Sequence, residues 1–426
     1  PWLGMPIADV SLLQRTLVVG SFLRKDHPLL AARLRQAGKK GAQLNVIGAG
    51  GEDLLMPATQ LLGAPSQWLS LLSQVAVAVA AANNVARPGG TDSIEAGDVA
   101  KRIAASLASG ERKAVFLGNA AVAHPQFSQL HALAQWVAQQ TGATLGFLTE
   151  AANTVGGYVA GALPQGNGLD AAAMLAQPRR AYVLLGAEPE FDTANPGQAR
   201  AALDQADTVI VLAPFASRAA LEYADVLLPT APFTETSGTF VNCEGLPQSF
   251  NGVVRSLGDS RPAWKVLRVL GNLLNVPGFE YDSSEVVRDE VLAKPVTARL
   301  SNTTTALTAA PAAAAAGLER LADVPIYHAD PIVRRAGSLQ LTAAARAAVR
   351  AGVPADLYAQ LGLANGDAVR VTQGQRSVVL PAVLDKSLAS GVIRVPAATE
   401  ASAQLGAMFG AVSVEKVESS ALAATV

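Results

Sequence analysis

The feature that most constrains this chain is a series of short, uninterrupted apolar runs that alternate with helix-like stretches over most of its length. The runs lie at residues 16–20, 43–47, 114–117, 145–148, 182–185, 208–212 and 226–228. Strands that are apolar throughout occur in parallel sheets whose two faces are both covered. Their alternation with helices predicts an α/β fold built from doubly wound, Rossmann-like lobes.

The C-terminal region has a different pattern. Short strand-like runs lie at residues 368–372, 376–380, 391–395 and 412–417, and two of them alternate apolar with polar side chains. Such alternation is typical of a half-buried antiparallel sheet, so we expect a separate, β-barrel-like domain here. Residues 301–317 are rich in alanine and threonine and lack branched apolar periodicity, so we interpret them as part of a linker.

These patterns predict four parts of the chain. They are a first α/β lobe at residues 1–105, a second α/β lobe at 106–300, a linker at 301–325 and a β-barrel-like domain at 326–426. Each lobe and the barrel has a length that is ordinary for a folded domain.

Two helices stand out by their apolar periodicity. Within the longest uncharged stretch, residues 54–86, four residues follow helical spacing: Leu69, Leu72, Ala76 and Val79. They predict a surface helix with one buried stripe, because prolines, glutamines and serines make the stretch too polar for a membrane span. A second helix, at residues 262–275, is expected to bury Trp264, Leu267, Leu270 and Leu274.

The composition excludes several classes of protein. Lysine and arginine number 33 against 34 aspartate and glutamate, and a net charge of −1 lacks the basic excess of a nucleic-acid-binding protein. A hydrophobic content of 50% is too high for a disordered chain. The single cysteine, Cys243, excludes a disulfide framework and a cysteine-ligated iron–sulfur cluster in this sequence, and we interpret it as an inert thiol.

Three of the predicted strands end in the same way. Gly20, Gly118 and Gly186 each follow an apolar run and precede a polar loop and a proline. Ligands of open α/β sheets bind at the carboxyl ends of the strands, so these loops, with Arg24 and His27 on the first, are candidate cofactor-facing residues. The alternative is that strand-to-helix loops need glycine and proline for their backbone conformation alone.

The densest polar stretch, residues 235–245, is a further candidate. It contains Gly238 and Asn242, and it follows the apolar run that ends near residue 228. A segment of this kind either binds a ligand or folds back as a tight loop that caps its own backbone. Its composition leaves both alternatives open.

Two other patterns are weaker. Residues 48–53 resemble part of a dinucleotide-binding fingerprint, but the last glycine is missing and Asp53 would repel a pyrophosphate. A nucleotide-binding protein would need the complete fingerprint. His27, His124 and His131 lie on different elements or lack the spacing of a zinc-binding helix, so we expect no metal site.

Several long blocks of the sequence resemble one family. They are residues 18–37, 147–158, 223–245, 248–254 and 261–274. These blocks resemble the large iron–sulfur subunit of bacterial NADH:quinone oxidoreductase. More distantly, residues 224–242 resemble molybdopterin enzymes such as formate dehydrogenase. Family members normally carry arginine after Glu244 and Gly245, whereas Leu246 stands here.

The resemblance implies a fold of the molybdopterin oxidoreductase type and a place in respiratory complex I. The chain would be peripheral, on the cytoplasmic face of the bacterial inner membrane, and its partners would be the other subunits of the peripheral arm. The family's iron–sulfur clusters would belong to domains that precede Pro1 in the full-length protein. No cofactor and no metal are expected in this segment.

The resemblance also implies a role and a set of residues. The chain would be a scaffold that supports electron transfer from NADH through iron–sulfur clusters to quinone, coupled to proton translocation. No residue is assigned a catalytic role. The candidates for the border of a vestigial cofactor cleft are Gly20, Arg24, His27, Gly118, Gly186, Gly238 and Asn242. The alternative is the large subunit of a molybdopterin-dependent oxidoreductase of the formate dehydrogenase type.

Overall fold

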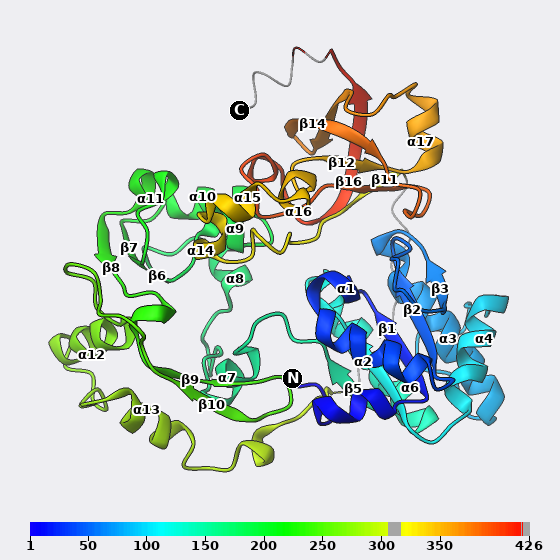
Figure 1. Cartoon of the computed structure of the whole chain (residues 1–426), viewed down its shortest axis with the longest axis horizontal. Helices are drawn as coiled ribbons and strands as arrows, with labels where there is room; N and C mark the ends of the chain where they lie inside the picture. Colours follow the sequence, from blue (N-terminus) through cyan, green and yellow to red (C-terminus); the bar gives the residue numbers. More distant parts are fainter. Residues whose placement is uncertain (306–316, 419, 421–426) are drawn as a thin grey trace. The chain divides into compact units, whose positions relative to one another are not determined.

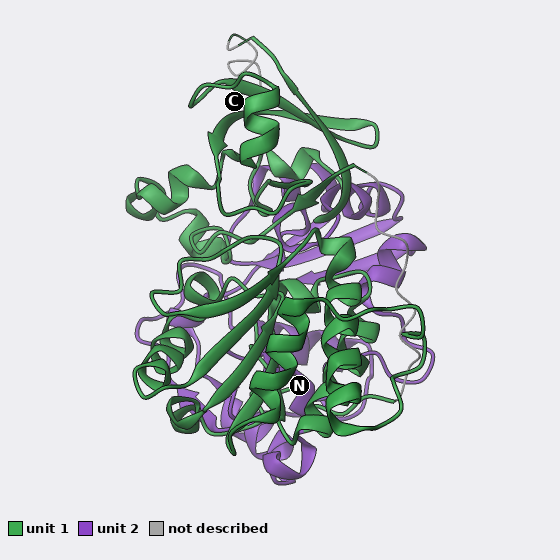
Figure 2. Cartoon of the chain, turned by 90° about the vertical axis from the view of Figure 1, so that its right-hand side faces the viewer, with its two compact units in different colours: residues 1–150, 301–426 green, residues 151–300 purple. Residues whose placement is uncertain are grey.

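The chain folds into two compact units. The computed structural model describes residues 1–305, 317–418 and 420. Unit 1 comprises Pro1–Glu150 and Ser301–Val426, and unit 2 comprises Ala151–Leu300 (Figure 2). The structure therefore groups the N-terminal lobe with the C-terminal region and separates both from the middle of the chain.

A five-stranded parallel sheet forms the centre of the N-terminal part of unit 1 (Figure 1). Its strands stand in the order β3-β2-β1-β4-β5. Their bounds are β1 (Arg15–Val19), β2 (Gln43–Gly48), β3 (Ala58–Leu62), β4 (Lys113–Leu117) and β5 (Thr144–Phe147). We expected β4 and β5 in the second lobe, but both continue this sheet on the free side of β1. The boundary expected at residue 105 therefore falls inside one sheet.

Helices link and cover the strands of this sheet. They are α1 (Leu23–Asp26), α2 (Pro28–Gly38), α3 (Trp68–Asn83), α4 (Asp98–Ala108), α5 (Asn119–Val122) and α6 (Phe127–Thr141), with short 3-10 helices at Ile7–Leu12 and Pro65–Gln67. The expected surface helix is α3, but it is buried on more than one face because it packs against both α4 and α6. Among the residues that the structure describes, none of the helices has the length and apolar character needed to cross a membrane.

The C-terminal part of unit 1 is a closed six-stranded barrel, which confirms the predicted β-barrel-like domain. Its strands, in barrel order, are β11 (Leu318–Leu321), β15 (Val392–Arg394), β12 (Ala351–Val353), β14 (Arg376–Leu384), β13 (Ala368–Gln373) and β16 (Phe409–Lys416). The first of them, β11, lies within the expected linker. Residues 306–316 of that linker lie outside the described residues.

Five short helices accompany the barrel: α14 (Pro331–Arg334), α15 (Gly337–Gln340), α16 (Ala343–Ala347), α17 (Ala355–Gln360) and a 3-10 helix at Ser402–Gln404. The barrel has a hydrophobic core of its own, and it also contributes side chains to the core of the N-terminal lobe. Phe409 of β16 packs against Trp68 of α3 and against His124, with ring centroids 6.1 and 5.5 Å apart. Leu321 and Val392 also belong to the core of the N-terminal lobe. This shared burial explains why residues so distant in sequence form one unit.

Unit 2 contains a parallel sheet of three strands, β6 (Ala181–Leu185), β7 (Thr208–Ala213) and β8 (Val226–Pro229), and a hairpin of β9 (Gly238–Val241) and β10 (Pro247–Phe250). Its helices are α7 (Thr154–Val159), α8 (Ala171–Ala176), α9 (Pro189–Asp192), α10 (Pro196–Leu203), α11 (Arg218–Tyr223), α12 (Ala263–Leu273) and α13 (Ser284–Val291), with 3-10 turns at Phe233–Glu235 and Val296–Arg299. The parallel sheets of both units confirm the predicted α/β class.

One expectation for unit 2 was wrong. Trp264, Leu267 and Leu270 of α12, which we expected to be buried, are only half-buried. Leu274, directly after the helix, is 64% exposed. Gly271 is the buried residue of this helix. The helix has the predicted apolar periodicity, but within this unit its apolar face finds little to pack against.

Candidate functional site

The first candidate site is the carboxyl edge of the unit 1 sheet, between β1 and β4. The chain leaves β1 toward β2 on one side, and β4 lies on the other, so the strand order reverses at this point. Ligands of open α/β folds bind in the crevice at such a reversal. The structure brings Gly20 and Gly118 together here.

The two glycines allow the loops on either side of the crevice to meet. The backbone N–H of Ala121 donates to the carbonyl oxygen of Gly20 at 3.0 Å. A Cβ atom on Gly118 would lie 2.3 Å from the Cβ of Ser21, and one on Gly20 would lie 2.7 Å from the backbone nitrogen of Ala121. Gly20 also has a φ of +59°, which side chains other than glycine rarely adopt. Because neither glycine has a side chain, the two loops contact each other directly and their backbone fills the crevice.

The amide groups at the start of α1 are occupied by a carboxylate of the same chain. Glu52, from the loop after β2, accepts a hydrogen bond from the backbone N–H of Arg24 at 2.8 Å and also lies against the N–H groups of Leu23 and Lys25. Burial raises the pKa of Glu52, and the three N–H groups oppose that rise. In a nucleotide-binding loop, a phosphate of the ligand takes the position next to such amides.

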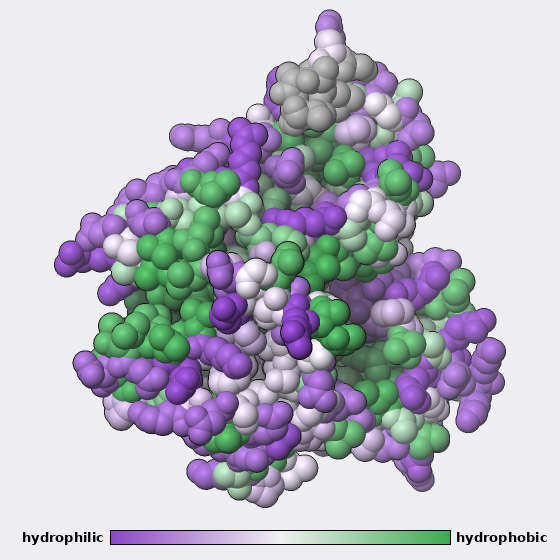
Figure 3. Space-filling view, turned by 60° about the vertical axis from the view of Figure 1, so that its left-hand side comes forward, coloured by the Kyte–Doolittle hydropathy of each residue, from purple (hydrophilic) through white to green (hydrophobic). Residues whose placement is uncertain are grey.

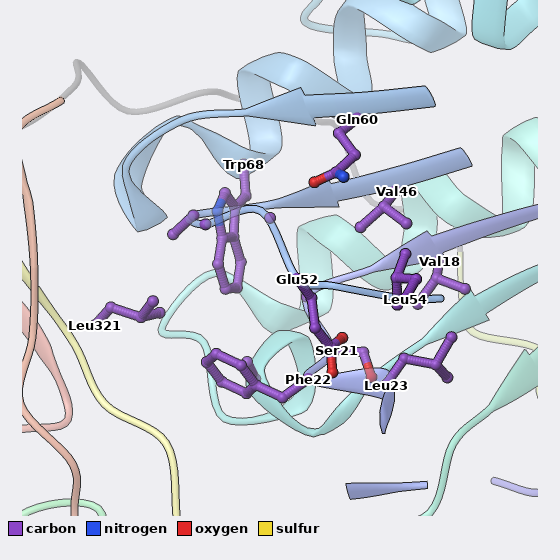
Figure 4. A pocket seen from close by; sticks show the side chains of 15 residues that line it. Val18, Ser21, Phe22, Leu23, Val46, Glu52, Leu54, Gln60, Trp68 and Leu321 are labelled. Atoms are coloured by element: carbon purple, nitrogen blue, oxygen red, sulfur yellow. The ribbon is translucent and has the colours of Figure 1, made fainter. Parts of the chain in front are cut away.

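Beside Glu52 is a small cavity of about 30 Å³ (Figure 4). Its walls include Ser21, Leu23, Glu52, Gln60 and Trp68. A cavity of this size holds about one water molecule. The side chains shown in Figure 4 converge on this space from β1, β2, β3, α3 and their loops, so this cavity has no room for a pyrophosphate or a pterin.

Arg24 and His27 do not face this cavity as a pair. The guanidinium of Arg24 is exposed and contacts Asp53, both its backbone oxygen and its carboxylate. His27 is buried, and burial lowers its pKa. The side chain of Asn119 lies close to His27 and opposes the lowering of its pKa. Among the described residues, neither Nε2 of His27 nor Oδ1 of Asn119 forms a hydrogen bond of ordinary geometry.

A cluster of charged side chains ties the loop after β1 to the barrel. The buried carboxylate of Asp323 accepts two hydrogen bonds from Arg394, both at 2.9 Å, and lies 3.5 Å from the Nζ of Lys25. Arg394 and Lys25 lie 4.9 and 5.2 Å from the ring centroid of Phe22. Burial disfavours the charge on Asp323, but Arg394 and Lys25 outweigh it and lower its pKa. We call Phe22, Lys25, Asp323 and Arg394 the clasp.

Sequence reasoning missed both Glu52 and the clasp. Asp323 and Arg394 are 71 residues apart, and neither belongs to a motif. Glu52 lies in the glycine-rich stretch that we compared with a dinucleotide fingerprint. Glu52 stands at a variable position of that fingerprint, so no local signal marks it.

The carboxyl edge of the unit 2 sheet has a different character. Gly186 ends β6 with a φ of +62°, and open space surrounds the position of its missing side chain. The residues that follow it are acidic. Glu190 accepts hydrogen bonds from the hydroxyls of Ser217 and Tyr223 at 3.2 and 3.4 Å. Burial and the neighbouring Glu188 raise the pKa of Glu190. Carboxylates at this position disfavour a bound phosphate.

Gly238 and Asn242 have structural roles in the β9–β10 hairpin. The Oδ1 of Asn242 accepts hydrogen bonds from the backbone N–H groups of Glu244 and Leu246, at 3.1 and 2.9 Å, and so closes the turn. A Cβ atom on Gly238 would lie 2.7 Å from the ring of Phe250. Of the two alternatives for this segment, its hydrogen bonds match the loop that caps its own backbone. Within the described ranges, no three histidine, cysteine, aspartate or glutamate side chains gather in a metal-binding group.

Comparisons with known proteins agree with this architecture. The family model described as "Molybdopterin oxidoreductase" matches residues 2–273, which is well over half of the chain. No curated protein matches the sequence. Among solved structures, acetylene hydratase from Pelobacter acetylenicus is similar with a TM-score of 0.63 at 12% identity, over 96% of this chain and 81% of that one. At that identity the likeness concerns the fold. The family match and the shared fold together show that the chain belongs to the molybdopterin oxidoreductase family.

Proposed function

We propose that this chain is a scaffold part of the peripheral arm of a bacterial NADH:quinone oxidoreductase. Within that complex it supports electron transfer from NADH through iron–sulfur clusters to quinone, and it carries no catalytic residue of its own. The partners are the other subunits of the peripheral arm, at the cytoplasmic face of the inner membrane. Five sequence blocks resemble the large iron–sulfur subunit of that complex, and they support the choice of this complex within the family.

The single observation that carries the scaffold role is the position of Glu52. Its carboxylate lies on the amide groups at the start of α1, so these N–H groups are already occupied and do not offer a site to an anionic ligand. The clasp then ties the same loop to the barrel. Both features stabilise a closed sheet edge, as expected of a lobe that kept the family's fold and lost its cofactor.

The second candidate is the large subunit of a molybdopterin-dependent oxidoreductase. The family match favours it, because the family takes its name from that cofactor. The two candidates differ in one measurable property. A molybdopterin enzyme binds one molybdenum and a pterin in each chain, whereas the scaffold binds neither.

The experiment is elemental analysis of the chain purified from its native host, combined with fluorescence of any pterin released by acid. We expect molybdenum well below one atom for each chain and no pterin signal. A full equivalent of molybdenum with pterin would overturn the scaffold role and establish the second candidate.

A genetic experiment tests the choice of complex. Deleting the coding region for this chain from a host that depends on the complex should abolish membrane NADH oxidation and assembly of the arm on native gels. Restoring the chain with the Glu52→Gln substitution should restore both, because that substitution keeps a hydrogen-bond acceptor for the α1 amides. An active, assembled complex that lacks the chain would contradict the proposal.

A further inference from the structure

The three-stranded sheet of unit 2 ends on one side at β6, which is hydrogen-bonded to β7 (Figure 1). The N–H of Gly186, directly after β6, donates to the carbonyl oxygen of Leu212 in β7 at 2.8 Å. Backbone groups point to alternate sides along a strand, so those of Ala181, Val183 and Leu185 point away from β7. In the part of the chain that the structure describes, no group forms a hydrogen bond with them.

The side chains of the same three residues are exposed. Ala181 is exposed at the start of β6, and Val183 and Leu185 are 52% and 48% exposed. The register places Val183 beside Ile210 and Val226, and Val226 is exposed too. Figure 3 shows apolar side chains gathered on the side of the molecule that carries β8. One face of this parallel sheet is therefore partly uncovered, although such sheets are normally covered on both faces.

Other sheet edges of the molecule are protected by the chain itself. On the outer side of β5, the N–H of Phe147 donates to the carbonyl oxygen of Trp2 at 2.8 Å. After β8, the N–H of Ala231 donates to the carbonyl oxygen of Arg261 at 2.9 Å, and β3 is half-buried along its whole length. Residues 181–187 have neither the charged side chains nor the prolines that normally guard an edge. An apolar edge without such protection is ready to pair with another chain.

The two ends of β6 carry opposite charges. Arg179 and Arg180 precede the strand, and Glu188 and Glu190 follow it. Arg180 pairs with Asp207, whereas Arg179 is exposed and forms no ion pair within the described residues. An antiparallel neighbour with the same charge order places its acidic end beside Arg179, and a parallel one would bring like charges together. A second β6 has the charge order that this edge requires.

From these features we infer that β6 pairs with β6 of a second copy of this chain, antiparallel and about a two-fold axis at Val183. Val183 then lies opposite its counterpart, and Ala181 lies opposite Leu185, so a small side chain faces a large one. Because the backbone groups of these residues point outward, each opposed pair exchanges two hydrogen bonds. The two sheets join into one sheet of six strands, and a two-fold contact of this kind closes after two copies. This inference does not depend on which oxidoreductase the chain serves.

The first test is the mass of the purified full chain in solution. We expect sedimentation velocity to show a concentration-dependent equilibrium between monomer and dimer. Val183→Lys places two cations opposite each other at the two-fold axis, so it should raise the dissociation constant of the dimer by about tenfold. The control Val253→Lys changes a valine that is 85% exposed elsewhere in unit 2, and it should leave the dimer unchanged. A monomer at every concentration, open-ended aggregation or an unchanged dimer with Val183→Lys would overturn the inference.

Disulfide cross-linking tests the register without adding charge. In a chain that also carries Cys243→Ala, Val183→Cys should give a disulfide-linked dimer under mild oxidation, because opposed Cα atoms lie about 5.5 Å apart. Leu185→Cys alone should not, since its counterpart would lie about 13 Å away along the strand. A mixture of Ala181→Cys and Leu185→Cys chains should again form a linked dimer. No disulfide with Val183→Cys, or an equally fast one with Leu185→Cys alone, would contradict the two-fold pairing.

A last pair of variants tests the charge order. Arg179→Glu places a carboxylate beside the acidic end of the second copy, so it should raise the dissociation constant by about threefold, whereas Arg179→Lys should leave it unchanged. Arg179 is exposed, so neither change should alter the urea midpoint of unfolding. A dissociation constant that Arg179→Glu does not change would overturn the antiparallel arrangement.

Discussion

The two units bury their apolar side chains to different degrees. In unit 1 the sheet and its helices form one large core with Trp68 and Leu72, which Phe409 of the barrel joins, and the barrel interior forms a second core. The core of unit 2 is a small cluster around Tyr182, Leu203 and Val209. Unit 1 also closes its sheet edge with Glu52 and the clasp, whereas the edge of unit 2 is open at Gly186 and acidic. The same α/β pattern thus produces one self-sufficient unit and one unit with apolar surface left to bury.

The largest effect should come from the clasp. The substitution Asp323→Asn leaves Arg394 and Lys25 close together without their buried counter-charge, so we expect unit 1 to lose about 3–5 kcal/mol of unfolding free energy. Glu415→Gln removes an exposed partner of Arg370 and should cost less than about 1 kcal/mol. Urea unfolding measures both. Equal losses would mean that the clasp does not hold the barrel to the lobe.

A leucine in each unit provides the next test. Leu72 of α3 is fully buried, so Leu72→Ala should cost about 2–5 kcal/mol. Leu274 follows helical spacing as clearly, yet it is 64% exposed, so Leu274→Ala should change stability by less than about 0.5 kcal/mol. Thermal and urea unfolding of the two variants measure both changes in stability. A large loss for Leu274→Ala would show that unit 2 buries α12 as the sequence suggested.

These two leucines also show what sequence periodicity can predict. The alternation of strands and helices predicted the α/β class, and the alternating runs near the C-terminus predicted the barrel. Helical spacing predicted that α3 and α12 exist, but burial depends on what lies opposite each helix. For α3 the opposing elements are α4 and α6, and for α12 little within its unit faces the apolar stripe.

The pairing of the strands could not be predicted from the sequence for a similar reason. The apolar run at residues 114–117 does not indicate that β4 pairs with β1, because that pairing depends on side-chain packing across the whole sheet. Of the candidate residues, Gly20 and Gly118 do follow the carboxyl ends of their strands as expected, but they lie together on one sheet and not in two lobes. Glu52 and Asp323 act through partners that are distant in sequence, and no local pattern marks them.

A smaller effect is expected at the closed edge. Glu52→Ala removes the acceptor for the α1 amides and should cost about 1–2 kcal/mol, whereas Glu52→Gln keeps an acceptor and should cost less. Hydrogen exchange of the amides of Arg24 and Lys25 reports the change locally, and it should accelerate in the alanine variant only. Unchanged exchange in both variants would show that Glu52 does not hold α1.

The response of stability to mild acid should be the smallest effect. It also distinguishes the two units most directly. All four histidines, His27, His124, His131 and His328, lie in unit 1, and burial lowers the pKa of each. A histidine whose folded pKa is lowered takes up its proton first in the unfolded chain. Unit 1 should therefore lose stability as the pH falls below about 6.5, the ordinary histidine pKa.

Unit 2 should respond in the opposite direction because it has no histidine and burial raises the pKa of Glu190. A carboxyl group with a raised folded pKa adds stability as the pH falls, and the same rise at Glu52 offsets part of the histidine effect in unit 1 at lower pH. Pulse proteolysis in urea at about pH 7.5 and 6, with the fragments assigned by mass spectrometry, follows the two units separately. We expect unit 1 alone to become more sensitive at the lower pH.

His124 provides the control for that experiment. Its Nδ1 accepts a hydrogen bond from the backbone N–H of Gln126 at 3.0 Å, while its Nε2 lies 3.0 Å from the carbonyl oxygen of Pro65. The neutral ring satisfies both contacts, with the proton on Nε2, and a second proton on Nδ1 would oppose the N–H of Gln126. His124→Gln should therefore reduce the acid sensitivity of unit 1. If unit 2 opened first at pH 6, or if His124→Gln left the acid response unchanged, the buried neutral histidines would not explain the difference between the units.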